Sequence, residues 1–115
     1  MDSLWKTIRE EVEREVGKEP LLANFLYGAV LNHKSLEDAL TFLLASKLEN
    51  STMPAIAMRD LLEEAFENDP GIGKAVRTDI KAVRDRDPAC PGYSTPLLYF
   101  KGFHAMQAYR AAHYF

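Results

Sequence analysis

The chain has 115 residues, of which 47% are hydrophobic and 27% charged, and its formal net charge is -3. This composition predicts one folded domain with a modest core, spanning residues 1–115, and excludes a disordered chain. The slight acidic excess disfavours nucleic acid, because phosphate binding usually shows as a basic stripe. Cys90 is the only cysteine, so no internal disulfide can form, and we expect a cytoplasmic protein.

The longest apolar run covers residues 21–31, about half of the roughly 20 residues that a membrane span needs. The amino-terminal residues lack the basic-then-apolar order of a secretory signal. We therefore expect no membrane association.

Helical periodicity extends through almost the whole chain. Leu4, Ile8 and Val12 fall on one side of a first helix that Gly17 ends. Proline and cap residues then mark the starts of four more helices, because proline is favoured in a first helical turn and Ser or Asp just before it. These predicted helices begin at Pro20, at Ser35, at Pro54 and after Asp69.

Residues 85–94 form the only substantial non-helical stretch, and a last helix is predicted from Thr95-Pro96 to the end. Its polar residues recur every three positions, so they wind around the helix and indicate packing against several neighbours. No stop signal follows Tyr114-Phe115, so we expect further protein or a partner chain to cover these aromatics. The fold class is all-α, a bundle of about six helices with a loop before the last one. The winding polar residues are Lys101, His104, Gln107, Arg110 and His113.

Several residues invite a metal or catalytic interpretation, and a structural one is favoured for each. The acids of the first helix read as a solvated face, and no Glu-x-x-His motif indicates a di-iron site. The three histidines are interpreted as surface or interface residues. Two of them lie on opposite sides of the last helix, so they cannot bind one metal ion together. Cys90 reads as an unreactive loop thiol. The residues concerned are Glu10, Glu11, Glu13, Glu15, His33, His104, His113 and Cys90.

Asp87 has two interpretations that the residues alone leave open. Asp87-Pro88 marks a turn in which Arg84 or Arg86 pairs with an acid on the surface, a contact worth little. A loop carboxylate can also hold the ammonium group of an amino acid through a charge-assisted hydrogen bond.

The order of these segments resembles the amino-terminal helical domain of bacterial and plant-type serine O-acetyltransferases. The resemblance covers essentially the whole chain and is most specific from Asp87 to Arg110. The other matching blocks are Glu19-Pro20-Leu21-Leu22-Ala23, Leu43-Leu44-Ala45-Ser46-Lys47-Leu48, Met53-Pro54-Ala55-Ile56-Ala57 and Asp79-Ile80-Lys81-Ala82-Val83-Arg84.

The resemblance implies an enzyme that transfers acetyl from acetyl-CoA to L-serine in cysteine biosynthesis, with feedback inhibition by L-cysteine at the serine site. The family adds a left-handed parallel β-helix that carries the catalytic His and the acetyl-CoA groove. No hexapeptide repeat of that β-helix occurs here, so we expect no catalytic residue, cofactor or metal in this chain and no activity from it alone. Asp87 matches the family aspartate that contacts serine or cysteine, and Pro88 would shape its loop.

The resemblance also implies partners. These domains join two trimers into a hexamer, so self-association as a dimer or larger assembly is expected. O-acetylserine sulfhydrylase is a further partner of the family and binds a carboxyl tail that this chain lacks. The rival interpretation is a free-standing helical adaptor that binds protein without catalysis.

Overall fold

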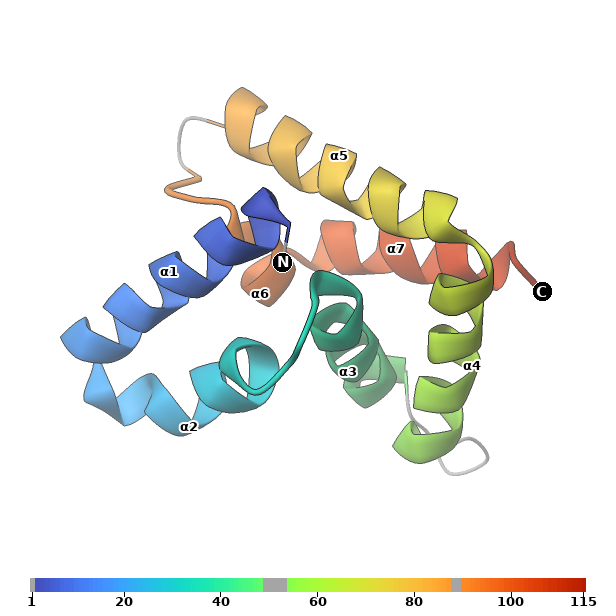
Figure 1. The fold of residues 1–115 in the computed structure, drawn as a ribbon, viewed down its shortest axis with the longest axis horizontal. Coiled ribbons are helices and arrows are strands. Elements are labelled where there is room, and N and C mark those ends of the chain that lie inside the picture. Colours follow the sequence, from blue (N-terminus) through green and yellow to red (C-terminus); the bar gives the residue numbers. More distant parts are fainter. Residues whose placement is uncertain (1, 49–53, 88–89) are drawn as a thin grey trace.

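The computed structural model describes residues 2–48, 54–87 and 90–115, and these residues form seven α-helices and no strand (Figure 1). This confirms the all-α class. None of the helices in the described ranges is long and apolar enough to cross a membrane. In chain order the helices are α1 (Ser3–Lys18), α2 (Ala23–Leu26), α3 (Leu36–Leu48), α4 (Ala55–Asn68), α5 (Pro70–Arg86), α6 (Ser94–Tyr99) and α7 (Lys101–Ala112).

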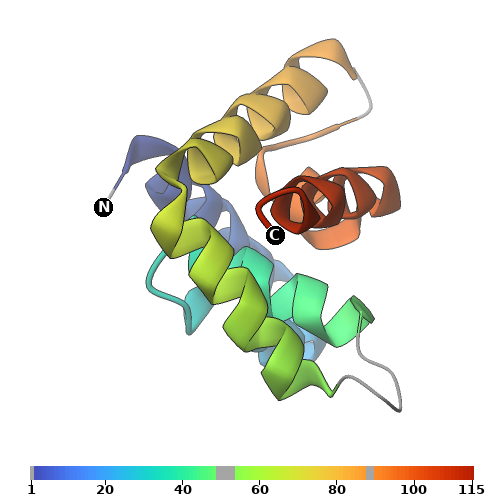
Figure 2. The ribbon, with the colours of Figure 1, turned by 90° about the vertical axis from the view of Figure 1, so that its right-hand side faces the viewer.

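The second predicted helix is continuous but irregular. A 3₁₀ turn, η1 (Pro20–Leu22), leads into α2, and a π-helical turn, η2 (Tyr27–Leu31), follows it. Figure 1 shows α1 and α2 joined at one end of the molecule, with α5 running above α7. In Figure 2, α3 and α4 lie together on the other side of α7 from α5. The long helix α5 contacts α4, α6 and α7, while α1 contacts α6 and the α2–η2 segment.

Capping residues explain several helix starts. The Asp2 side chain accepts the backbone N–H of Trp5 at 3.0 Å, and the Asp69 side chain accepts that of Gly71 at the same distance. Ser35 Oγ accepts the N–H of Asp38 at 3.1 Å, which confirms the predicted start of α3. Each cap satisfies an amide that has no partner within its own helix.

One core joins the helices. The predicted stripe of α1 is buried from Leu4 to Val12, and Ile80 of α5 is fully buried. The second and fourth predicted helices bury only part of their apolar residues, because Leu22 and Phe25 are exposed and Ile56 at the start of α4 is 78% exposed. The residues that these two helices do bury are Leu26, Ala29, Val30, Leu31, Leu62, Ala65 and Phe66.

The single helix predicted from Thr95 is wrong, because the chain breaks at Phe100 into α6 and α7. Phe100 adopts an extended conformation, with φ -88° and ψ 106°. A helix end leaves carbonyls without partners, and the ring of His104 donates from Nε2 to one of them, the Leu97 carbonyl. The predicted winding of polar residues is confirmed, since His104 and Gln107 are buried whereas Lys101 is exposed.

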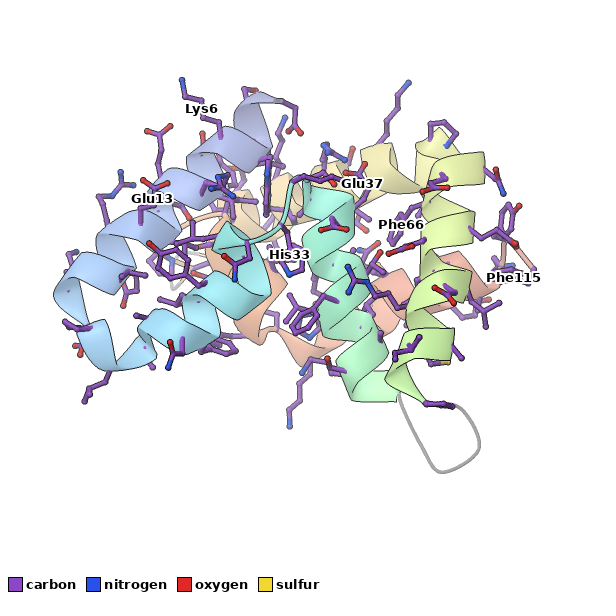
Figure 3. All side chains as sticks on the ribbon, turned by 60° about the horizontal axis from the view of Figure 1, so that its bottom comes forward. Lys6, Glu13, His33, Glu37, Phe66 and Phe115 are labelled. Atoms are coloured by element: carbon purple, nitrogen blue, oxygen red, sulfur yellow. The ribbon has the colours of Figure 1, made fainter. Side chains whose placement is uncertain are left out.

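The surface interpretation of the histidines is wrong for two of the three. His104 is buried, and His33 is buried between η2 and α3 (Figure 3). The His33 ring contacts Asp38 Oδ2 at 2.8 Å through Nδ1 and the Gly28 carbonyl at 2.7 Å through Nε2. Both rings therefore fasten helix ends within the fold, and only His113 lies on the surface.

Candidate functional site

Asp87 lies directly after the last turn of α5, where the chain leaves the helix. Its N–H donates to the Val83 carbonyl at 3.0 Å, and its own carbonyl accepts the N–H of Cys90 at 2.9 Å. The side chain is half-buried. Pro88, the other predicted site residue, lies outside the described residues. The backbone of Asp87 is thus held through both of its polar groups, by Val83 of α5 and by the N–H of Cys90.

A recess of about 530 Å³ opens beside Asp87, between α5 and α7. Its lining combines side chains of both signs of charge with apolar ones. The lining residues are Asp79, Ala82, Val83, Arg86, Asp87 and Met106.

The predicted exposed cluster of charges before Asp87 is present in part. Arg84, Asp85 and Arg86 are exposed. The Arg84 guanidinium lies 5.4 Å from the centre of the Tyr93 ring, so this cation contacts an aromatic face in the returning loop. Arg86 faces the recess with Asp87.

A polar cluster fastens α7 to α5 behind the recess. Gln107 is fully buried and donates to Asp79 Oδ2 at 2.7 Å, and Arg110 donates to the same oxygen at 2.6 Å. Arg110 also donates to Gln107 Oε1 at 2.7 Å. Because buried polar groups are costly unless they are paired, this closed set of contacts holds α7 against α5.

Glu11 is the residue that sequence reasoning missed. It was expected on the solvated face of α1, but its carboxylate is half-buried and accepts two backbone N–H groups, from Tyr93 at 3.1 Å and from Ser94 at 2.9 Å. One signal could have found it: Glu11 follows Ile8 by three residues, which places an acid at the edge of the apolar stripe. The solvated interpretation holds for Glu10, Glu13 and Glu15, which are exposed.

Within the described ranges, no three His, Cys, Asp or Glu side chains come together as a metal site would require. Cys90 is 5% exposed, and its thiol donates to the Gly92 carbonyl at 3.2 Å. A sulfur in this setting is not presented to a substrate.

The arrangement can therefore bind but offers little chemistry. A carboxylate at the edge of a recess can hold an ammonium group, whereas acyl transfer also needs a base on the attacking hydroxyl and a held thioester. Fold and site together define an all-α domain with a half-buried carboxylate, Asp87, at the edge of a recess.

Comparison with known proteins shows the family to which this domain belongs. The family model described as "Serine acetyltransferase, N-terminal" matches residues 4–108. The serine acetyltransferase of Haemophilus influenzae is 50% identical over 111 residues, which cover 96% of this chain and 42% of that protein. The chain thus spans less than half of the curated relative's length. It belongs to the family of serine acetyltransferase amino-terminal domains.

Solved structures agree with this assignment. Two serine acetyltransferase structures, one in complex with CoA and one with cysteine, are 50% identical, with TM-scores of 0.94 and 0.93. They are covered over 47% and 46% of their chains and match 96% of this one. The Neisseria gonorrhoeae serine acetyltransferase in complex with serine has a TM-score of 0.93 at 47% identity, over 99% of this chain and 47% of its own.

Proposed function

We propose that this chain is the amino-terminal domain of an enzyme that transfers acetyl from acetyl-CoA to the hydroxyl of L-serine, forming O-acetyl-L-serine for cysteine biosynthesis. The observation that carries the proposal is the match of nearly the whole chain to the first part of serine acetyltransferases. The catalytic base and the CoA groove belong to a following β-helix domain. This helical domain contributes assembly and the Asp87 loop.

A thiol-release assay tests the division of labour. The purified 115-residue chain should give no acetyl transfer from acetyl-CoA to L-serine, because one loop carboxylate supplies neither a base nor a thioester site. The complete protein, expressed from the same gene with its β-helix domain, should be active. Turnover by the short chain that survives repurification would contradict the proposal.

Asp87 is proposed to hold the ammonium group that serine and inhibitory cysteine share. In the complete enzyme, Asp87→Ala should raise the KM for serine and weaken cysteine inhibition together. Loss of one charge-assisted hydrogen bond is worth about 1.5–3 kcal/mol, or roughly ten- to hundred-fold. Asp85→Ala is the matched control, because Asp85 is an exposed acid two residues away. Unchanged constants for both amino acids in Asp87→Ala would return Asp87 to a structural role.

Self-association of this domain, as the dimer of trimers known for the family, is also part of the proposal. Its support is exposed apolar surface on the α2 side: Leu21 is 97% exposed, and the Phe25 and Tyr99 rings stack in the open with centroids 6.4 Å apart. Such patches usually mark interfaces. Sedimentation across a hundred-fold dilution should show a dimer or larger species, and Phe25→Lys should weaken it. A monomer at every concentration would refute this assembly role.

The remaining assignments are less specific. A single buried thiol fits the reducing cytoplasm, where we place the enzyme. O-acetylserine sulfhydrylase would bind outside this chain, through the carboxyl tail of the parent. The rival function, a free-standing adaptor, is supported by the exposed Met106, Tyr109 and Phe115, and a stop codon after Phe115 in the gene would favour it.

A further inference from the structure

Glu11 stands on α1, far in sequence from the loop that carries Asp87, yet it holds the end of that loop. One carboxylate oxygen accepts the N–H of Tyr93 at 3.1 Å and the other accepts the N–H of Ser94 at 2.9 Å. These amides begin α6, and the side chain of Tyr93 supplies no cap of its own. An ionised acceptor that takes two N–H groups is stronger and more directional than a neutral one.

The backbone beside the carboxylate is shaped to receive it. Gly92 is buried, and a Cβ added there would lie 2.7–2.9 Å from three atoms of the Glu11 carboxyl group. Real side chains do not tolerate such separations, so the carboxylate occupies the space that a larger residue would fill. Glycine at this position and Glu11 on α1 thus form one fitted contact.

Further contacts connect the segment held by Glu11 to Asp87. The Cys90 thiol donates to the Gly92 carbonyl at 3.2 Å, and the Cys90 N–H donates to the Asp87 carbonyl at 2.9 Å. Tyr93 in turn lies against the Arg84 guanidinium, in the last turn of α5. The described part of the loop is therefore tied to α5 at its start and to α1 at its end.

We propose that Glu11 is a positioning residue for the amino-acid site: it fixes the 90–94 segment and so sets where Asp87 stands when serine or cysteine binds. The inference rests on the function proposed for Asp87. Glu11 touches no substrate in this scheme. Its effect passes through the backbone, and small displacements of a binding group are known to be costly.

The test uses the complete enzyme and four constants: kcat, the KM for serine, the KM for acetyl-CoA and the inhibition constant of cysteine. Glu11→Ala should raise the serine KM and the cysteine constant together, by about five- to twenty-fold, less than the loss expected for direct removal of Asp87. The acetyl-CoA KM should stay unchanged. Glu11→Gln keeps one acceptor oxygen and should fall between Glu11→Ala and the parent. Glu13→Ala is the matched control, an exposed acid on the same helix (Figure 3).

A second variant pair tests the fitted contact itself. Gly92→Ala should displace the carboxylate and raise the serine KM as Glu11→Ala does. In the double variant the serine KM should rise no further than in either single variant, because both substitutions disrupt the same contact. Fully additive effects would contradict a shared contact and overturn the proposal.

The two proposals fail in different ways. If Asp87→Ala raises the serine KM while Glu11→Ala leaves it unchanged, the positioning role is overturned and the Asp87 site stands. If Glu11→Ala lowers only the yield of folded enzyme, with both amino-acid constants intact, the residue is merely structural and the proposal is again overturned. If Asp87→Ala itself has no effect, the proposed amino-acid site fails, and the positioning role fails with it.

Discussion

The ion-pair cluster around Arg77 offers the sharpest prediction about stability. Its guanidinium donates to both oxygens of Glu37, at 2.8 and 2.9 Å, and to Asp2 at 3.0 Å. These contacts tie the middle of α5 to the first turn of α3 and to the cap of α1. Gly73 lies close enough that an added Cβ would strike the Glu37 carboxylate, so the pair is packed tightly against the α5 backbone.

We expect Arg77→Met, which keeps most of the aliphatic stem, to lower the free energy of unfolding by about 2 kcal/mol. This value lies between the contributions of a buried charged hydrogen bond and of a surface ion pair. The Glu37 pair supplies most of it, because the Arg77 and Glu37 side chains are only 22% and 31% exposed. The Asp2 contact adds little, since Asp2 is 41% exposed and solvent screens the pair. For a domain of this length the change corresponds to a Tm lower by roughly 8 °C.

The cost of Arg77→Met should also depend on pH, because two of the partners of Arg77 are carboxylates. Burial alone would raise the pKa of Glu37, but the hydrogen bonds and charge of Arg77 outweigh it and hold the pKa below its ordinary 4.5. The hydrogen bond from Arg77 lowers the pKa of Asp2 likewise. A carboxylate with a lowered folded pKa stabilises above its unfolded pKa and loses this effect as the pH falls through the folded one. The cost of Arg77→Met should therefore shrink at acidic pH, below about 4.

Urea unfolding of the parent chain, Arg77→Met and the exposed-residue control Lys81→Met, at about pH 7 and pH 3, measures this directly. Lys81 lies on the same helix and is exposed. A loss under about 0.5 kcal/mol at neutral pH, or an equal loss at both pH values, would show that the cluster is held by packing and not by charge.

Two further predictions concern α7. Burial, which outweighs the bond to the Leu97 carbonyl and acts with the charge of Lys47, lowers the pKa of His104 below its ordinary 6.5. Below this pH the unfolded chain binds a proton at His104 more readily than the folded chain does, so the free energy of unfolding should fall as the pH drops below about 6.5. His104→Gln should reduce this dependence, as measured by urea unfolding at several pH values. Gln107→Leu should cost about 1–2 kcal/mol in the same unfolding assay, because Asp79 and Arg110 each lose a partner at a buried site. An unchanged midpoint would mean that water replaces the Gln107 amide.

Much of the fold could be predicted because its signals are local. Ser35 and Asp69 were predicted to start helices, and each caps one within three residues of itself, because a helix cap is a short-range interaction. The break at Phe100 could not be predicted, since Phe100 carries no helix-breaking chemistry. It is stabilised by the ring of His104, whose bond to Leu97 forms only once the two helices cross.

For the candidate site, the sequence singles out Asp87, whose role stays a prediction, and gives no indication of the residues around it. Its binding role is what the resemblance implies, because the residues alone favour a surface ion pair. Glu11 lies 82 positions from Tyr93, and no spacing rule joins residues at that separation. Partners of this kind depend on how α1 packs against α6, which is a property of the folded chain.

The burial of Cys90 has a consequence for the inhibitor that the proposed site would receive. Thiol–disulfide exchange requires that a thiolate reach the sulfur it attacks. Cys90 lies three residues after Asp87 and is 5% exposed, and its thiol donates to the Gly92 carbonyl. Free cysteine at Asp87 would thus meet no accessible sulfur from Cys90, and the mixed disulfide that would turn reversible inhibition into covalent inactivation is sterically prevented.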